Sequence, residues 1–198
     1  TSKSGSAKSD NTPHLFSVAG KKMESYFSPS DYTTSHIQDA INTADFTADF
    51  ALLTFTRNEL GTALVSAERR GVNVRGIIEN IGDQGSEYDY LRSNQIDCRQ
   101  DVVSGLLHHK YAIIDDANPT SDPILITGSH NWTSSAETSN DENTIIFHDA
   151  DIANLFRQEF EARWLGNTVG IEPVQQLNGF EWTAGPSPAH EILNISFI

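Results

Sequence analysis

Apolar residues follow two spacings along the chain from Met23 onward, and the two spacings alternate. Short β-branched or aromatic segments predict strands, and apolar residues repeated at three- and four-residue intervals predict helices. The clearest helix is predicted over 59–70, where apolar residues recur at i, i+3, i+4 and i+7 and Gly71 supplies a stop. The alternating order is typical of a layered α/β fold. The predicted strands are 24–27, 50–54, 73–78, 97–99, 111–114, 124–127 and 144–147, and the other predicted helices are 35–44, 86–93 and 151–164.

The same pattern predicts a single folded domain. A chain of 198 residues is long enough for one sizeable hydrophobic core. We expect a polar linker at 1–20, the folded domain at 21–166, and a C-terminal extension at 167–198 in which the pattern weakens. Within the domain, segment 116–123 is rich in Asp, Asn and Pro, which predicts a hairpin with a long loop.

Composition excludes several classes of protein. A single cysteine, Cys98, rules out an internal disulfide framework and a multi-cysteine metal site, so we expect it to fill the core. No apolar segment approaches the roughly 20 residues that span a bilayer. The formal net charge of −14 repels polyanions over most of the surface, which disfavours a nucleic-acid binder that works by its overall field. A small basic site stays compatible with that charge, because salt screens distant carboxylates.

One of the seven histidines stands in a spacing that suggests phosphate chemistry. His108 is followed by Lys110 and Asp115, which gives the pattern H-x-K-x-x-x-x-D. On a strand, residues two apart point to the same side, so we expect the imidazole and the ammonium to face one pocket. Lys110 is also the only lysine after Lys22. An imidazole beside an ammonium group is suited to attack on a phosphate.

Two further segments supply polar groups near strand ends. Ser129 and Asn131 follow the predicted strand 124–127, and their side chains could donate hydrogen bonds to non-bridging phosphate oxygens. Glu142 opens the next predicted strand region, and a carboxylate there could hold an imidazole N–H and fix its tautomer. Read singly, these would be ordinary turn residues and a solvated carboxylate. Their spacing relative to His108 favours a site.

The chain resembles the phospholipase D superfamily, and in particular its small single-motif members, the bacterial endonucleases and their mitochondrial relative. The resemblance rests on GLLHHKYAIID at 105–115, TGSHNWT at 127–133 and AETSNDEN at 136–143, and it extends over roughly 23–165. It implies a mixed β-sheet sandwiched between helices, the α-β-α fold of that superfamily. It also implies a metal-independent hydrolase without a cofactor.

By that resemblance, His108 would attack phosphorus and form a phosphohistidine, while Lys110, Ser129 and Asn131 neutralise charge on the phosphoryl oxygens. A second histidine must protonate the leaving oxygen. His109 should point to the opposite face of the strand, and the chain holds one copy of the motif, so we expect a homodimer with a shared site. A second motif in a longer precursor is the alternative, because both ends of the chain look cut.

Asp115 is expected to have a structural role rather than a catalytic one. Seven residues of strand would place it roughly 23 Å from His108 at 3.3 Å per residue. The loop 116–123 is longer than in the shortest members of the superfamily, which leaves the rim of the site and its influence on substrate choice open. The remaining histidines lack convincing metal spacing, so no catalytic metal is expected.

Three functions remain in competition. The first is a nuclease of low sequence specificity, which is the function we expect because the single-motif members that the chain resembles are mostly nucleases. The alternatives are a phospholipase D acting on phospholipid headgroups and a non-catalytic module that binds phosphate-containing ligands. The net charge disfavours DNA and anionic membranes alike, so it does not choose between the first two. The intact set of motif residues argues against the binding module.

The C-terminal tail bears on the compartment. Segment 185–195 resembles the opening of the C-terminal sorting domain of type IX secreted Bacteroidetes proteins, with Ser187 in the place where Asn is usual. A terminal strand after a Pro-rich turn explains the segment equally well. The tail leads to the expectation of a secreted or cell-surface bacterial protein.

Overall fold

The computed structural model describes residues 7–116, 118 and 120–167. In this part of the chain, eight strands form one sheet in the order β1-β2-β8-β7-β6-β3-β4-β5. The strands are β1 (Leu15–Val18), β2 (Lys21–Ser28), β3 (Thr47–Leu52), β4 (Asn73–Ile78), β5 (Asp97–Gln100), β6 (Lys110–Ile114), β7 (Ile124–Gly128) and β8 (Glu142–His148). The helices are α1 (Thr33–Asn42), α2 (Asn58–Arg70), α3 (Tyr88–Ser93), α4 (Ser134–Thr138) and α5 (Ala150–Gly166).

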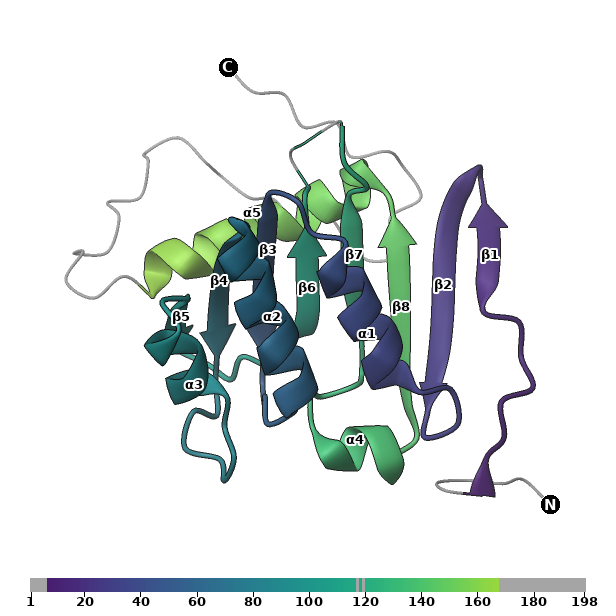
Figure 1. The fold of residues 1–198 in the computed structure, drawn as a ribbon, viewed down its shortest axis with the longest axis horizontal. Helices are drawn as coiled ribbons and strands as arrows, with labels where there is room; N and C mark the ends of the chain where they lie inside the picture. The colour runs from purple at the N-terminus through teal and green to yellow at the C-terminus, as the bar shows by residue number, and fades with distance from the viewer. Residues whose placement is uncertain (1–6, 117, 119, 168–198) are drawn as a thin grey trace, which may run out of the picture. The chain divides into compact units, whose positions relative to one another are not determined.

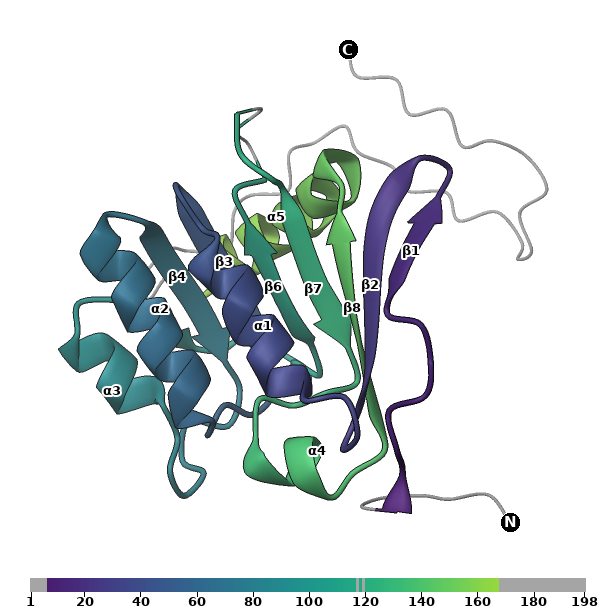
Figure 2. The same ribbon diagram turned by 45° about the vertical axis from the view of Figure 1, so that its right-hand side comes forward.

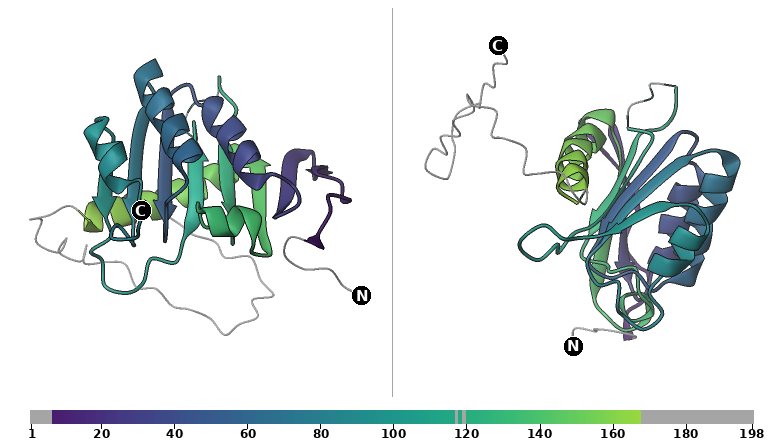
Figure 3. Two further views of the ribbon diagram at one scale, coloured as in Figure 1. Left: turned by 60° about the horizontal axis from the view of Figure 1, so that its bottom comes forward. Right: turned by 90° about the vertical axis from the view of Figure 1, so that its left-hand side faces the viewer.

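The sheet is mixed and lies between two helical layers. Strands β3, β4 and β5 run parallel, and the other neighbouring strands pair antiparallel. Helices α1, α2 and α3 cover one face and α5 covers the other, as Figure 1 and the edge-on view in Figure 3 show. The predicted fold class, a mixed sheet between helices, is confirmed. Among the described helices, none is both long and apolar enough to cross a bilayer.

Alternation along the central strands divides the core into two layers. Phe50 and Ala112 face α1 and α2, whereas Ala51 and Tyr111 face α5. The strands are apolar on both sides because both sides are covered. Cys98 is buried and unpaired in the layer beneath α1 to α3, so it does fill the core as predicted.

The structure corrects the bounds of several predicted elements, most clearly in three places. β1 lies inside the predicted linker 1–20 and pairs with β2, so the sheet begins earlier than the sequence suggested. All four of its residues are exposed, and a strand without a buried side shows no alternation. Strand β3 begins at Thr47 rather than at position 50, and α4 was not predicted because five residues are too few to show a helical period. The predicted tail segments from 168 onward lie outside the described residues.

Candidate active site

Three neighbouring strands bring the separate sequence motifs to one end of the sheet. β7 lies between β6 and β8, with Tyr111 opposite Thr127 and Gly128 opposite Thr144. Lys110, the first residue of β6, therefore lies beside the end of β7, where the segment with Ser129 begins. Figure 2 shows the start of β6, the end of β7 and the start of β8 at the same end of the sheet. The antiparallel register thus gathers groups that are more than 30 residues apart.

His108 lies in the loop immediately before β6. Its side chain is exposed, and its main-chain carbonyl accepts a hydrogen bond of 2.9 Å from Nζ of Lys110. Pairing with β3 extends one residue beyond β6, since N of Leu53 donates to O of His109 at 2.9 Å. The assumption that His108 itself belongs to a strand is wrong, because the strand begins two residues later, at Lys110. The contact with Lys110 still holds the two residues together.

His109 points to the other face of the sheet, as strand alternation predicts. Its Nε2 lies 3.1 Å from Oε1 of Glu159 in α5. The hydroxyl of Tyr111 donates to the same carboxylate. Burial alone would raise the pKa of Glu159, but hydrogen bonds from His109, Tyr111 and Arg163 lower it to about 2. This pairing orients His109 away from Lys110.

Lys110 and Glu142 interact electrostatically across the site. Partial burial of Lys110 lowers its pKa, and the negative charge of Glu142 opposes that shift. Oε1 of Glu142 accepts a hydrogen bond of 3.1 Å from Nδ2 of Asn140. Among the described residues, the structure records no hydrogen bond between Glu142 and His108. The predicted role of Glu142 as the orienting carboxylate of that imidazole remains a prediction.

The charge of Glu142 predicts the pH dependence of turnover. In Glu142→Gln, burial acts on Lys110 unopposed, so the pKa of Lys110 falls further. The ammonium form is the one expected to stabilise the phosphoryl oxygens, so the alkaline limb of a plot of kcat/KM against pH should move to lower pH. Asp141→Asn, which removes an adjacent negative charge, is the control and should leave that limb in place. An unmoved limb in Glu142→Gln would refute this coupling.

Ser129 is held against the start of β8. Its backbone N donates to O of Asn143 at 3.0 Å, and its Oγ accepts from N of Asn143 at 3.1 Å. Oδ1 of Asn131 is buried and has no hydrogen-bond partner among the described residues. The next residue, Trp132, is buried in the core. Trp132 therefore anchors the segment that carries both polar side chains.

Gly128 permits this close approach of β7 to β8. It has a φ of +152°, and a Cβ atom built on it would lie 2.1 Å from O of Asn143. We expect Gly128→Ala to lower the free energy of unfolding by about 1–3 kcal/mol, because the strands must separate. It should also lower kcat by displacing Ser129. Urea titration and steady-state kinetics measure both effects; Gly82→Ala is the control, because open space surrounds Gly82. Stability and kcat at the wild-type level in Gly128→Ala would contradict the steric argument.

A contact between His130 and Glu137 behind this segment was not predicted from the sequence, where His130 is one of the histidines without metal spacing. Its side chain is only 1% exposed, and Nε2 lies 3.4 Å from Oε2 of Glu137. The same oxygen accepts hydrogen bonds from N and Oγ1 of Thr34, at 2.8 and 2.7 Å. Burial would raise the pKa of Glu137, but the neighbouring His130 ring and the hydrogen bonds from Thr34 lower it to about 2. Glu137 thereby joins α4, α1 and the segment after β7.

Asp115 lies at the opposite end of β6 from His108. Its carboxylate accepts hydrogen bonds from the backbone N–H groups of Asp45, Phe46 and Thr47 at 2.8–2.9 Å, and from Oγ of Ser121 at 2.6 Å. All these partners lie at the start of β3 or in the β6–β7 loop. The contacts of Asp115 are therefore structural ones.

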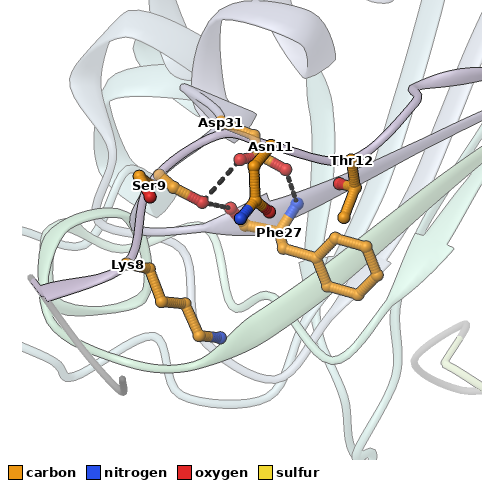
Figure 4. A pocket seen from close by; sticks show the side chains of 7 residues that line it. Lys8, Ser9, Asn11, Thr12, Phe27 and Asp31 are labelled. Atoms are coloured by element: carbon orange, nitrogen blue, oxygen red, sulfur yellow. Dashed lines mark hydrogen bonds between the residues drawn. The ribbon is translucent and has the colours of Figure 1, made fainter. Parts of the chain in front are cut away.

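A cavity of about 520 Å³ lies elsewhere, between the N-terminal segment and the turn after β2. Lys8, Phe27 and Asp31 are among its lining residues, as Figure 4 shows, and none of the phosphate-motif residues lines it. Nearby, His14 is satisfied by the carbonyl of Ser25 at 2.9 Å and by Oδ1 of Asp10 at 3.0 Å. The cavity is therefore not lined by the cluster around His108, although Phe27 pairs with Asn143 across β2 and β8.

Comparison with known proteins explains the clustered motifs. Residues 37–164 match the family model described as "Cardiolipin synthase, PLD-like domain". The chain belongs to the phospholipase D-like family. It is 32% identical over 146 residues to a mitochondrial cardiolipin hydrolase of Chlamydomonas reinhardtii. The aligned region covers 73% of this chain and 63% of that protein. The mitochondrial cardiolipin hydrolase of Mus musculus is 36% identical over 137 residues, with 68% and 59% covered.

Solved structures agree with this assignment. The phospholipase D family member Nuc from Salmonella typhimurium superposes with a TM-score of 0.65 and 28% identity, over 73% of this chain and 95% of that one. The curated relatives are longer, since the chain spans 59–63% of the two cardiolipin hydrolases.

The expectation of a secreted or cell-surface bacterial protein was wrong, because these relatives, and a third from Homo sapiens, are named as mitochondrial proteins.

Proposed function

We propose that this protein is a hydrolase that cleaves phosphodiester bonds through a phosphohistidine on His108, without a metal ion. The observation that carries the proposal is the convergence of the three motif segments at one end of β6, β7 and β8. Lys110, Ser129 and Asn131 supply donors where charge develops on the phosphoryl oxygens. Glu142 supports the charged form of Lys110.

The reaction has two balanced steps. A ring nitrogen of His108 attacks phosphorus and forms an N–P bond, while the bond from phosphorus to the leaving oxygen breaks and that oxygen takes a proton from a second histidine. Water then attacks phosphorus and gives its proton to the second histidine, and the N–P bond breaks. His108 is regenerated, and the products are a phosphomonoester and an alcohol.

The second histidine has to come from outside the described cluster. His109 is turned toward Glu159, and His130 is buried beside Glu137. We therefore propose a two-fold homodimer in which His108 of the partner subunit supplies the acid. A monomeric mass by light scattering, measured on fully active protein, would contradict the shared site.

We propose a phospholipid phosphodiester as the substrate. Relatives 32–36% identical to the chain are named cardiolipin hydrolases, and the net charge of −14 opposes binding to a nucleic-acid polyanion. A nuclease of low specificity is the second candidate, supported by the resemblance to single-motif endonucleases and by the structural similarity to Nuc. Both substrates contain the same bond.

Hydrolysis assays in EDTA test the proposal. Bis(p-nitrophenyl) phosphate reports the chemistry, phosphatidylcholine vesicles that contain cardiolipin report the lipid substrate, and single- and double-stranded DNA report the nuclease. We expect turnover of the soluble diester and of the lipid, with DNA cleaved slowly or not at all. Turnover of DNA alone would replace the lipid assignment by the nuclease. Binding of these ligands without turnover would leave only a phosphate-binding module.

A further inference from the structure

The loop that leads from β5 to His108 exposes a group of aliphatic side chains. We name residues 102–107 the apolar loop, since they contain no charged residue. Val102, Val103 and Leu106 are 62%, 37% and 66% exposed, whereas Leu107 is buried. Grouped exposed aliphatic side chains mark interaction surfaces more often than chance exposure does.

The apolar loop is fixed at both of its ends. N of Val102 donates to Oδ1 of Asn167 at 2.6 Å, and N of Leu107 donates to Oε2 of Glu79 at 3.0 Å. Val103 reaches Gly166 at the end of α5, where an added Cβ would lie 3.0 Å from Cγ2 of Val103. In the right-hand view of Figure 3 the β5–β6 loop, in teal, projects from the sheet on the α5 side. A loop anchored in this way presents its apolar tip in a defined place.

The tip lies at the rim of the candidate site. Leu106 is separated from His108 by one residue, so any surface that covers Leu106 also lies next to His108. Leu165, the residue before Gly166, is 57% exposed and extends the aliphatic surface onto the end of α5. An apolar surface beside a phosphodiester site fits a substrate that is itself part of an apolar assembly.

We propose that the apolar loop inserts into the surface of a phospholipid bilayer and holds His108 at the level of the headgroups. The proposal rests on the proposed lipid phosphodiester substrate. The net charge of −14 provides no general attraction to anionic headgroups, so binding has to come from apolar burial. Transfer of Val102, Val103 and Leu106 out of water supplies it.

A second copy of the chain is the competing occupant, and the direction of the loop disfavours it. Lys110 shares the side of β6 that carries Ala112, which packs toward α1 and α2. The apolar loop instead leaves the sheet on the α5 side, where Val103 meets Gly166. A partner that meets the Lys110 side approaches from the face opposite to α5, whereas the loop projects on the α5 side.

The test compares Leu106→Ser with Leu155→Ser in the full chain. Leu155 is a matched control, because it is 64% exposed on α5 but lies eleven residues before Gly166. Binding is measured by co-sedimentation with phosphatidylcholine vesicles that contain cardiolipin, in a His108→Ala background so that the lipid stays intact. Hydrolysis of vesicle lipid and of bis(p-nitrophenyl) phosphate is measured with His108 present.

We expect Leu106→Ser to weaken vesicle binding and vesicle hydrolysis about ten-fold, because one large aliphatic side chain no longer leaves water. Its turnover of the soluble diester and its mass in solution should match those of the wild type, as should all properties of Leu155→Ser. Wild-type vesicle binding in Leu106→Ser would overturn the proposal. If Leu106→Ser loses both the mass of a dimer and the turnover of bis(p-nitrophenyl) phosphate, the loop contacts a second copy of the chain instead. If the wild type hydrolyses neither substrate, the proposed function fails, whereas the binding result in the His108→Ala background still judges the loop.

Discussion

Replacing His108 by alanine is expected to reduce kcat for bis(p-nitrophenyl) phosphate by a factor of about 10⁴ or more. In the proposed mechanism the substitution removes the nitrogen that forms the N–P bond, so the remaining phosphate-binding groups have no nucleophile to assist. The fold should be unaffected, because His108 is exposed in a loop and its side chain makes no hydrogen bond within the described residues. Stopped-time assays of turnover, and trapping of the phosphoryl adduct by quenching in alkaline denaturant, measure the two parts of this prediction.

His109→Ala is the matched control, since it removes the neighbouring imidazole. That side chain contacts Glu159 in α5 and faces away from Lys110, so we expect kcat within a few-fold of the wild type and an adduct of normal yield. The assignment of His108 as nucleophile is refuted if His108→Ala keeps more than a hundredth of wild-type kcat, or if it still accumulates the adduct. Loss of turnover in His109→Ala, with its fold intact, would instead move the chemistry to the other face of β6.

The second large effect concerns stability. Asp115→Ala should lower the free energy of unfolding by about 3–5 kcal/mol, because three part-buried backbone N–H groups just before and at the start of β3 lose the buried carboxylate that accepts from them. Urea unfolding monitored by circular dichroism measures the loss. Turnover per folded molecule should stay near the wild-type level, since Asp115 lies at the end of β6 away from His108.

Two variants make this result specific. Asp115→Asn retains one carbonyl oxygen that can accept from the N–H groups of Phe46 and Thr47, so it should lose less stability than alanine does. Asp83→Ala removes an exposed carboxylate from the β4–α3 loop and should change stability by less than about 0.5 kcal/mol. If Asp115→Ala has the free energy of unfolding of the wild type but loses turnover, Asp115 acts in the reaction, and the structural role assigned to it is refuted.

Local sequence predicted most of the central elements. β4 was predicted at its observed bounds, and α2 began only one residue earlier than predicted, because buried elements carry their period in consecutive side chains. The exposed strand β1 carries no such period and was taken for linker. Elements that pack on a neighbour leave a pattern in the sequence, whereas an edge strand held mainly by backbone hydrogen bonds leaves almost none.

The sequence by itself determined which residues are candidates for the proposed phosphate chemistry, because spacing within a motif is a local property of the chain. His108, Lys110, Ser129, Asn131 and Glu142 could all be named as candidates in that way. The tertiary structure alone decided which groups meet. The register of three antiparallel strands brings the motifs to one end of the sheet. Two half-buried carboxylates outside the predicted site hold the neighbouring segments: Glu79 accepts a hydrogen bond from N of Leu107, and Glu137 accepts one from N of Thr34 and lies beside His130. Such contacts depend on register and on the packing of helices against the sheet, and neither is written in the spacing of any single segment.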